Sequence, residues 1–142
     1  MLVRLLYASR ASASVNAEAL AAILRQSRAN NPALGVTGVL CHSEGVLLQL
    51  LEGGRSAVNS LYARILTDPR HAQVELLCYD EIGERRFAGW AMGQVNLSKL
   101  NRGLLLKYSE HPTLDPFALA GQASLALFDE LMATASIACP PP

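Results

Sequence analysis

The run Val46-Leu-Leu-Gln-Leu-Leu-Glu52 limits the possible folds more than any other stretch of this sequence. It has the length of a β-strand, and apolar residues occupy both of its alternating faces. A strand of this kind belongs to a sheet that is covered on both sides. The strand pattern of Gly35–Cys41 precedes it, and Ser43-Glu44-Gly45 supplies a turn between the two. The pair is therefore predicted to form a β-hairpin.

The rest of the chain alternates between strand and helix patterns. Asn16 is a suitable N-cap for a first helix, and Asn30-Asn31-Pro32 is predicted to end that helix. Asp115-Pro116 is a cap and first-turn signal for the last helix. The predicted elements around the hairpin are strand 2–9, helix 17–29, helix 55–67, strand 74–79, strand 90–95, helix 98–107 and helix 116–134.

This order, β-α-β-β-α-β-β followed by two helices, predicts an α+β fold. It corresponds to a ferredoxin-like, five-stranded mixed sheet with two helices on one face. The second face needs a cover, which the C-terminal helix pair, another subunit, or both could supply. We expect a main domain over residues 1–97, a helical cap over 98–138 and a frayed tail over 139–142, where three prolines prevent a helix.

Composition and charge exclude several classes of protein. The chain has 142 residues, 51% hydrophobic and 17% charged, which suits a folded domain with a buried core. Its formal net charge is zero and it has no Lys/Arg block, so neither nucleic acid nor a membrane is an expected partner. No apolar run is long enough to cross a bilayer. The three cysteines form no CxxC pair, which argues against a disulfide framework or metal site and favours a cytoplasmic location.

The two crossover helices carry stripes that begin apolar and end polar. The stripes are Leu20, Leu24, Ser27 and Asn31 on the first helix, and Leu61, Arg64, Ile65 and Asp68 on the second. Two such helices on one sheet face would enclose a slot for a planar ligand with one apolar and one polar edge, such as a flavin ring. Alternatively, Ser27 and Asn31 merely end a helix, and Arg64 and Asp68 form a surface ion pair.

Gln49 is the most unusual residue of the apolar strand. A buried amide is costly unless its carbonyl and N–H groups find partners. It could simply bond to the backbone, or it could exchange donor for acceptor against a ligand. Tyr7 would lie beside it if strands 2–9 and 46–52 are neighbours in the sheet; alone, such a tyrosine is an ordinary core residue.

Together these residues match a known pattern in order and spacing over about residues 2–96. The matching segments are Arg4-Leu-Leu-Tyr7-Ala-Ser9, Ser27-x-x-Asn30-Asn31-Pro-x-x-Gly35-Val-Thr-Gly38, Leu48-Gln49-Leu-Leu-Glu52-Gly53, Arg64-Ile-x-x-Asp68-Pro-Arg70-His71 and Arg86-Phe87-x-x-Trp90-x-Met92. The sequence thereby resembles the BLUF family of blue-light receptors. The remainder, including Leu104–Ser109, is similar to the helical tail of short BLUF photoreceptors, so no output domain is expected.

The resemblance implies roles for these residues. Tyr7 corresponds to the tyrosine that donates an electron and a proton to the excited flavin, and Gln49 to the glutamine that then reorients. Asn31 corresponds to the asparagine that bonds the carbonyl edge of the flavin. Trp90 and Met92 match positions whose exchange in and out of the pocket is proposed to carry the signal. The other implied flavin contacts are Asn30, Arg64 and Asp68 at the polar end, Ser27, Arg70 and His71 nearby, and Ile23, Leu24 and Ile65 against the ring.

The resemblance also implies a cofactor, partners and a mode of action. FAD is the usual cofactor, although FMN or riboflavin could fit. The protein would be a sensor and not an enzyme, relaying a red-shifted state through the Trp90–Met92 strand and the C-terminal helices to a signalling partner. Two positions depart from the family pattern. Leu47 replaces a frequent Phe, and Ala91 replaces a Ser beside the signal strand.

The apolar stripe of the last helix, with Ala120, Ala123, Leu127 and Leu131, indicates a homo-oligomer contact. Two alternative functions also remain for this sequence. A plain regulatory or dimerisation module would explain that stripe, but not Gln49, Asn31 and Trp90 as a set. A small phosphatase with an Arg/Asn pair would need a glycine-rich phosphate loop, which the sequence lacks.

Overall fold

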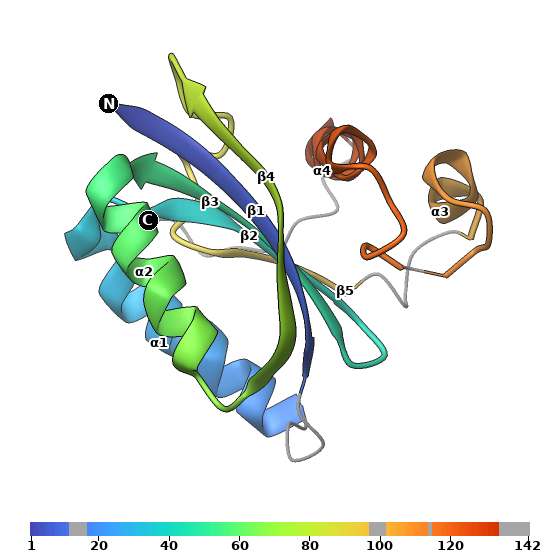
Figure 1. The fold of residues 1–142 in the computed structure, drawn as a ribbon, viewed down its shortest axis with the longest axis horizontal. Helices are drawn as coiled ribbons and strands as arrows, with labels where there is room; N and C mark the ends of the chain where they lie inside the picture. Colours follow the sequence, from blue (N-terminus) through green and yellow to red (C-terminus); the bar gives the residue numbers. More distant parts are fainter. Residues whose placement is uncertain (12–16, 97–101, 114, 134–142) are drawn as a thin grey trace.

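A five-stranded sheet forms the centre of the protein in the computed structural model (Figure 1). The structure describes residues 1–11, 17–96, 102–113 and 115–133. The strands run in the spatial order β4-β1-β3-β2-β5, and all neighbours are antiparallel except β2 and β5. Their bounds are β1 Leu2–Ala11, β2 Thr37–Ser43, β3 Val46–Gly54, β4 His71–Ile82 and β5 Gly93–Asn96. The predicted α+β fold with a mixed sheet is confirmed.

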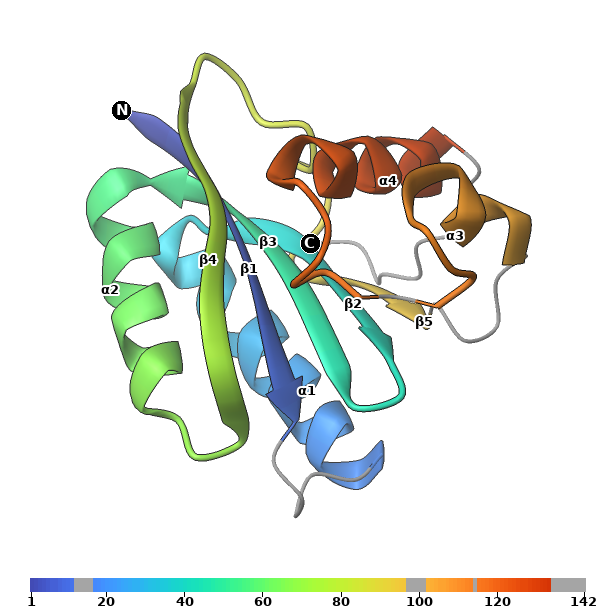
Figure 2. The same cartoon turned by 45° about the vertical axis from the view of Figure 1, so that its right-hand side comes forward.

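Helices lie on both faces of this sheet. Helices α1 (Ala17–Leu34) and α2 (Arg55–Thr67) cover one face, and α3 (Arg102–Tyr108) and α4 (Gly121–Ala133) lie over the other, as Figures 1 and 2 show. The C-terminal helices thus supply at least part of the cover that the doubly apolar strand requires. Among the described residues, none of the helices combines the length and the apolar character needed to span a membrane.

The alternation of side chains along β1 and β3 divides the interior into two cores. Leu5 and Leu51 point toward α1 and α2, in the core that also holds Tyr7. Leu6 and Leu48 point to the opposite side, where they pack with Leu127, Phe128 and Leu131 of α4. Because successive strand residues face opposite sides, a strand that is apolar throughout serves both cores.

The first helix is longer than predicted. It passes through Pro32 and ends at Leu34, so the predicted end at Asn30-Asn31-Pro32 is wrong. Gly35 ends the helix instead, with a φ of 70° in the left-handed region. The Val36 N–H donates to the Asn31 carbonyl at 3.0 Å and the Gly35 N–H to the Pro32 carbonyl at 3.1 Å, which is the Schellman motif. The extra turn keeps Asn31 inside a regular helix.

In the C-terminal half, strand β5 and helix α4 both begin later than predicted. Residues 90–92 are not part of a strand, because β5 begins only at Gly93, which pairs with Val39. Trp90 instead closes a turn by donating its N–H to the Phe87 carbonyl at 3.2 Å. The Asp115-Pro116 signal opens turns at residues 116–118 and not α4, which begins at Gly121. The predicted cap Asn16, the start of the helix at 98 and the tail 139–142 fall outside the described residues.

Candidate functional site

A cavity of about 120 Å³, partly open to solvent, lies between α1, α2 and the sheet. Its walls come from five elements, β1, α1, β3, α2 and β4, and from the loop after α2. The lining residues are Tyr7, Ile23, Gln26, Ser27, Asn30, Asn31, Leu34, Gln49, Leu61, Arg64, Ile65, Asp68, Arg70 and His71.

The cavity brings together nearly all the residues for which flavin contacts were predicted. Leu24 is the exception, because it is buried in the core beside the cavity. Three lining residues were not among the predicted contacts. Leu61 belongs to the stripe that was predicted to enclose the slot, although no flavin contact was assigned to it; Gln26 precedes Ser27 and carried no signal. Leu34 was missed because α1 was predicted to end before it.

Tyr7 and Gln49 form the inner wall of the cavity. They lie directly opposite each other in the antiparallel pairing of β1 and β3. The Tyr7 hydroxyl donates to Gln49 Oε1, and both residues are buried. The Gln49 amide donates from Nε2 to Met92 Sδ at 3.4 Å. The buried Gln49 amide therefore has a partner at each end, with Tyr7 at its acceptor oxygen and Met92 at its donor nitrogen.

Met92 and Trp90 lie on different sides of the sheet. Met92 is fully buried and belongs to the core beneath the cavity, and its carbonyl accepts a hydrogen bond from Arg28 Nε at 3.0 Å. Trp90 packs in the opposite core, with its ring 5.4 Å from that of Phe87. The structure thus places Met92, and not Trp90, beside Gln49.

Burial controls the chemistry of the Tyr7 hydroxyl. It raises the pKa of Tyr7 far above the ordinary tyrosine value, and the nearby Tyr62 and Asp68 add to the effect. The Tyr62 ring lies 5.5 Å from that of Tyr7. Tyr7 is therefore a neutral phenol that donates a hydrogen bond to Gln49.

The polar end of the cavity is organised around Asp68. Its carboxylate accepts hydrogen bonds from the backbone N–H of Arg70 at 2.9 Å and from Arg70 Nη2 at 2.6 Å, and these bonds lower the pKa of Asp68. Arg70 also donates to Gln26 Oε1 at 3.0 Å. The alternative prediction of an Arg64–Asp68 ion pair is wrong, because Asp68 pairs with Arg70 and Arg64 is exposed at the cavity wall.

His71 lies between this polar end and Tyr7. Its Nδ1 is 2.9 Å from the Ser9 hydroxyl, and its ring stands edge-on to the Tyr7 ring at 6.2 Å. Burial lowers the pKa of His71, and Asp68 opposes this effect. The histidine therefore favours its neutral form at pH 7.

Asn31 supplies the clearest sign of a ligand. It is only 2% exposed, and its Nδ2 has no hydrogen-bond partner among the described residues. A buried donor without a partner is costly, so it is expected to bond to something that enters the cavity. Ile23, Leu61 and Ile65 offer apolar walls beside it. This combination fits a flat ring with a hydrogen-bond acceptor on one edge, as a flavin has.

Comparison with known proteins relates this sequence to light-sensing proteins. A family model described as "BLUF: Sensors of blue-light using FAD" matches residues 2–93. Over 84 residues, or 59% of the chain, the sequence is 38% identical to the photoactivated adenylate cyclase subunit beta of Euglena gracilis. That match spans only 10% of the Euglena protein.

Two solved structures resemble the whole arrangement. BlsA in its photo-activated state superposes with a TM-score of 0.84 at 31% identity, covering 93% of this chain and 95% of BlsA. BlrB, a BLUF protein in its dark state, gives a TM-score of 0.79 at 32% identity, covering 94% of this chain and 96% of BlrB. The likeness therefore includes the C-terminal helices as well as the sheet.

Proposed function

Because this chain belongs to the BLUF family of flavin-binding blue-light sensors, we propose that it senses blue light through the Tyr7–Gln49–Met92 contact. The observation that carries the proposal is the hydrogen bond from the Tyr7 hydroxyl to Gln49 Oε1 at the wall of the cavity. The chain would act as a sensor and not as an enzyme.

The cavity residues are suited to hold an isoalloxazine ring. We assign the free Nδ2 of Asn31 to a flavin carbonyl, since it is buried and lacks another partner. Ile23 and Ile65 would pack against the ring, with Leu24 behind them. The residues assigned to its polar end and side chain are Ser27, Asn30, Arg64, Asp68, Arg70 and His71. FAD is the proposed cofactor, and FMN and riboflavin share the same ring.

The bound flavin would supply light absorption and, once excited, a strong oxidant. Tyr7 is the tyrosine among the residues that line the cavity, and its proton already lies on the hydrogen bond to Gln49. It would release an electron to the flavin and a proton through the Gln49 amide, and both would return to Tyr7 afterwards. Gln49 would remain rotated or tautomerised, with its donor and acceptor ends exchanged.

Such an exchange changes the contact with Met92. In the present arrangement, Gln49 Nε2 donates to Met92 Sδ. A rotated amide would place an oxygen against the sulfur, and this hydrogen bond would be lost. The proposed output is a shift of the segment that holds Trp90 and Met92, relayed by the C-terminal helices to a partner protein. Homo-oligomer formation belongs to the same proposal, but Leu127 and Leu131 of the predicted contact stripe pack against the sheet instead. The free cysteines Cys41 and Cys78 favour a reducing cytoplasm.

The visible absorption spectrum in darkness and after a blue pulse tests this proposal. We expect a flavin spectrum that shifts slightly to the red and recovers in darkness. Tyr7→Phe is expected to bind flavin and lose the shift, because the phenolic proton is gone. Tyr62→Phe is the matched control, since it deletes a neighbouring hydroxyl and leaves the bond to Gln49 intact.

Three outcomes would contradict the proposal. A normal shift in flavin-loaded Tyr7→Phe would exclude Tyr7 as the donor. A flavin spectrum in the wild type that bleaches without recovery would point to redox chemistry. Failure to bind flavin even on reconstitution would favour the regulatory or dimerisation module.

A further inference from the structure

Glu52 is a buried carboxylate on the side of the sheet away from the cavity. It follows Gln49 by three residues on β3 and is fully buried. Arg4 on β1 donates to it from Nε at 3.0 Å and from Nη2 at 2.8 Å. Two backbone N–H groups complete its partners, that of Arg86 at 3.1 Å and that of Phe87 at 2.8 Å.

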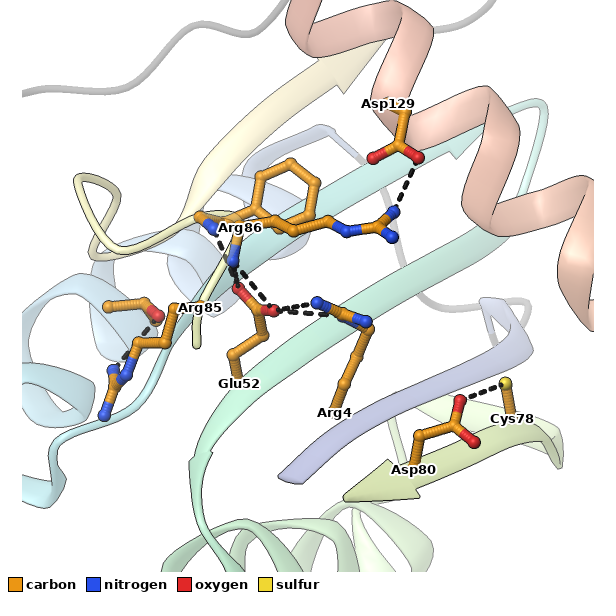
Figure 3. A network of polar contacts seen from close by, with 9 residues as sticks. Arg4, Glu52, Cys78, Asp80, Arg85, Arg86 and Asp129 are labelled. Carbon is orange, nitrogen blue, oxygen red and sulfur yellow. Dashed lines mark hydrogen bonds and ion pairs between the residues drawn. The ribbon is translucent and has the colours of Figure 1, made fainter. Parts of the chain in front are cut away.

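These bonds attach the loop after β4 to the central strand. A buried carboxylate needs a full set of donors, so residues 86 and 87 are held in position relative to β3 (Figure 3). Five residues later the same segment reaches the core beneath the cavity, where Met92 contacts Gln49. The segment 86–92 is therefore held to β3 at both ends, by Glu52 on one face and by Gln49 on the other.

The segment also makes two contacts with α4. The Phe87 ring meets the Phe128 ring in a T-shaped arrangement, with centroids 6.3 Å apart. The Arg86 guanidinium pairs with Asp129 through Nη1 and Oδ2 at 2.6 Å, and Figure 3 shows it extending from the loop to the helix. The aromatic contact is buried, while both side chains of the ion pair are nearly half exposed.

We propose that the Arg86–Asp129 ion pair couples α4 to the segment 86–92, so that a change at the Gln49–Met92 contact alters how α4 packs on the sheet. This inference rests on the proposed light response of Gln49, and it names the residues through which that response leaves the flavin side. Glu52 fixes one end of this connection. It holds the Arg86 backbone in place while the Arg86 side chain reaches Asp129 on α4.

Hydrogen exchange of the α4 amides, measured on the flavin-loaded protein in darkness and in continuous blue light, tests the coupling. We expect the wild type to show a light-induced change in exchange within residues 121–133. Asp129→Asn should reduce that change by about two- to fivefold, the size expected from a partly exposed ion pair. The red shift of the flavin should persist, since Asp129 lies on the other face of the sheet.

Glu130→Gln is the matched control. It makes the same chemical change at the adjacent position of α4, where Glu130 pairs with Lys107 of α3 at 2.8 Å. It should keep the wild-type exchange response. Arg86→Gln should reproduce the effect of Asp129→Asn, and the double variant should add little to either single variant, as expected for one shared contact.

Hydrogen exchange of α4 tests the coupling, whereas the absorption spectrum tests the light response, so the two proposals can be contradicted separately. An unchanged exchange response in Asp129→Asn, or an equal loss in Glu130→Gln, would overturn the coupling. So would a wild-type α4 whose exchange does not respond to light while the flavin spectrum shifts. Absence of the spectral shift in the wild type would instead contradict the proposed function.

Discussion

At the scale of single residues, two buried amides play different parts. Gln49 has a partner at each end of its amide, Tyr7 and Met92, which explains how an apolar strand accommodates it. Asn31 is equally buried, yet its Nδ2 has no partner among the described residues. In the proposed function, the Gln49 amide exchanges its partners and the Asn31 amide receives a flavin carbonyl.

The free amide of Asn31 predicts a loss of flavin affinity on its removal. A buried donor without a partner costs roughly 1–3 kcal/mol, which a flavin carbonyl would recover, so Asn31→Ala should weaken FAD binding by about ten- to a hundredfold. Titration of the apoprotein with FAD measures this. Asn59→Ala is the control, because Asn59 lies on α2 outside the cavity, and it should bind FAD as the wild type does. Equal affinities of Asn31→Ala and the wild type would exclude the assigned bond.

His71 predicts a pH dependence of stability. Burial holds its pKa in the folded protein below the ordinary 6.5. Just below about pH 6.5 the unfolded chain therefore binds more protons, and the free energy of unfolding decreases as the pH falls. Between about pH 7.5 and about pH 5.5, the urea midpoint of the apoprotein should fall less in His71→Gln than in the wild type. A variant of the exposed His111, His111→Gln, should follow the wild type; equal slopes for His71→Gln would contradict the effect.

At the scale of elements, the end of α1 positions the polar end of the cavity. The helix continues through Pro32 because the Schellman motif at Gly35 satisfies its last carbonyls. The additional turn contributes Leu34 to the cavity and keeps Asn31 on the inner side of the helix. A glycine with positive φ is therefore part of how the site is built.

Gly35→Ala should destabilise the protein. An L-residue in the left-handed region costs about 1–2 kcal/mol, so we expect the free energy of unfolding to fall by that amount. Urea denaturation measures it. Gly83→Ala is the matched control, since Gly83 lies outside the positive-φ region and an added Cβ there meets no atom within 4 Å. If both variants were equally stable, α1 would not depend on the left-handed cap.

At the scale of the whole molecule, the sheet separates the cavity from the core that α4 covers. The cavity lies under α1 and α2, and α4 packs over the opposite face (Figure 2). The segment 86–92 contacts both sides, with Met92 below the cavity and Phe87 against α4. A perturbation on one side can therefore reach the other through a single short segment.

Phe128→Ala should test whether α4 is integral to the fold. Phe128 is fully buried in the core between α4 and the sheet, so its truncation should lower the free energy of unfolding by about 3–5 kcal/mol. Leu106→Ala, at a position 50% exposed on α3, should change it by less than about 0.5 kcal/mol. Urea unfolding measures both. A small effect of Phe128→Ala would mean that residues 98–138 form a separable cap.

Much of this architecture follows from the sequence alone. The alternation of side chains and the turn residues predict the order of strands and helices, because each signal depends only on neighbours a few residues apart. The pairing of Tyr7 with Gln49 follows from the same topology. The start of β5 and the start of α4 were predicted too early, because turns at residues 87–90 and 115–119 use residues that strands and helices also accept.

The tertiary structure alone decided which charged and sulfur-containing groups meet. Asp68 pairs with Arg70 although Arg64 stands at helical spacing from it, because the chain turns back after α2. Met92 lies under the cavity and Trp90 on the far side, because Glu52 and Arg28 hold the segment between them from opposite faces. The Asp68–Arg70 pair is local, but it depends on the turn that follows α2. The contacts of Met92 with Gln49 and Arg28 depend on distances between elements that are far apart in the chain, which local patterns do not report.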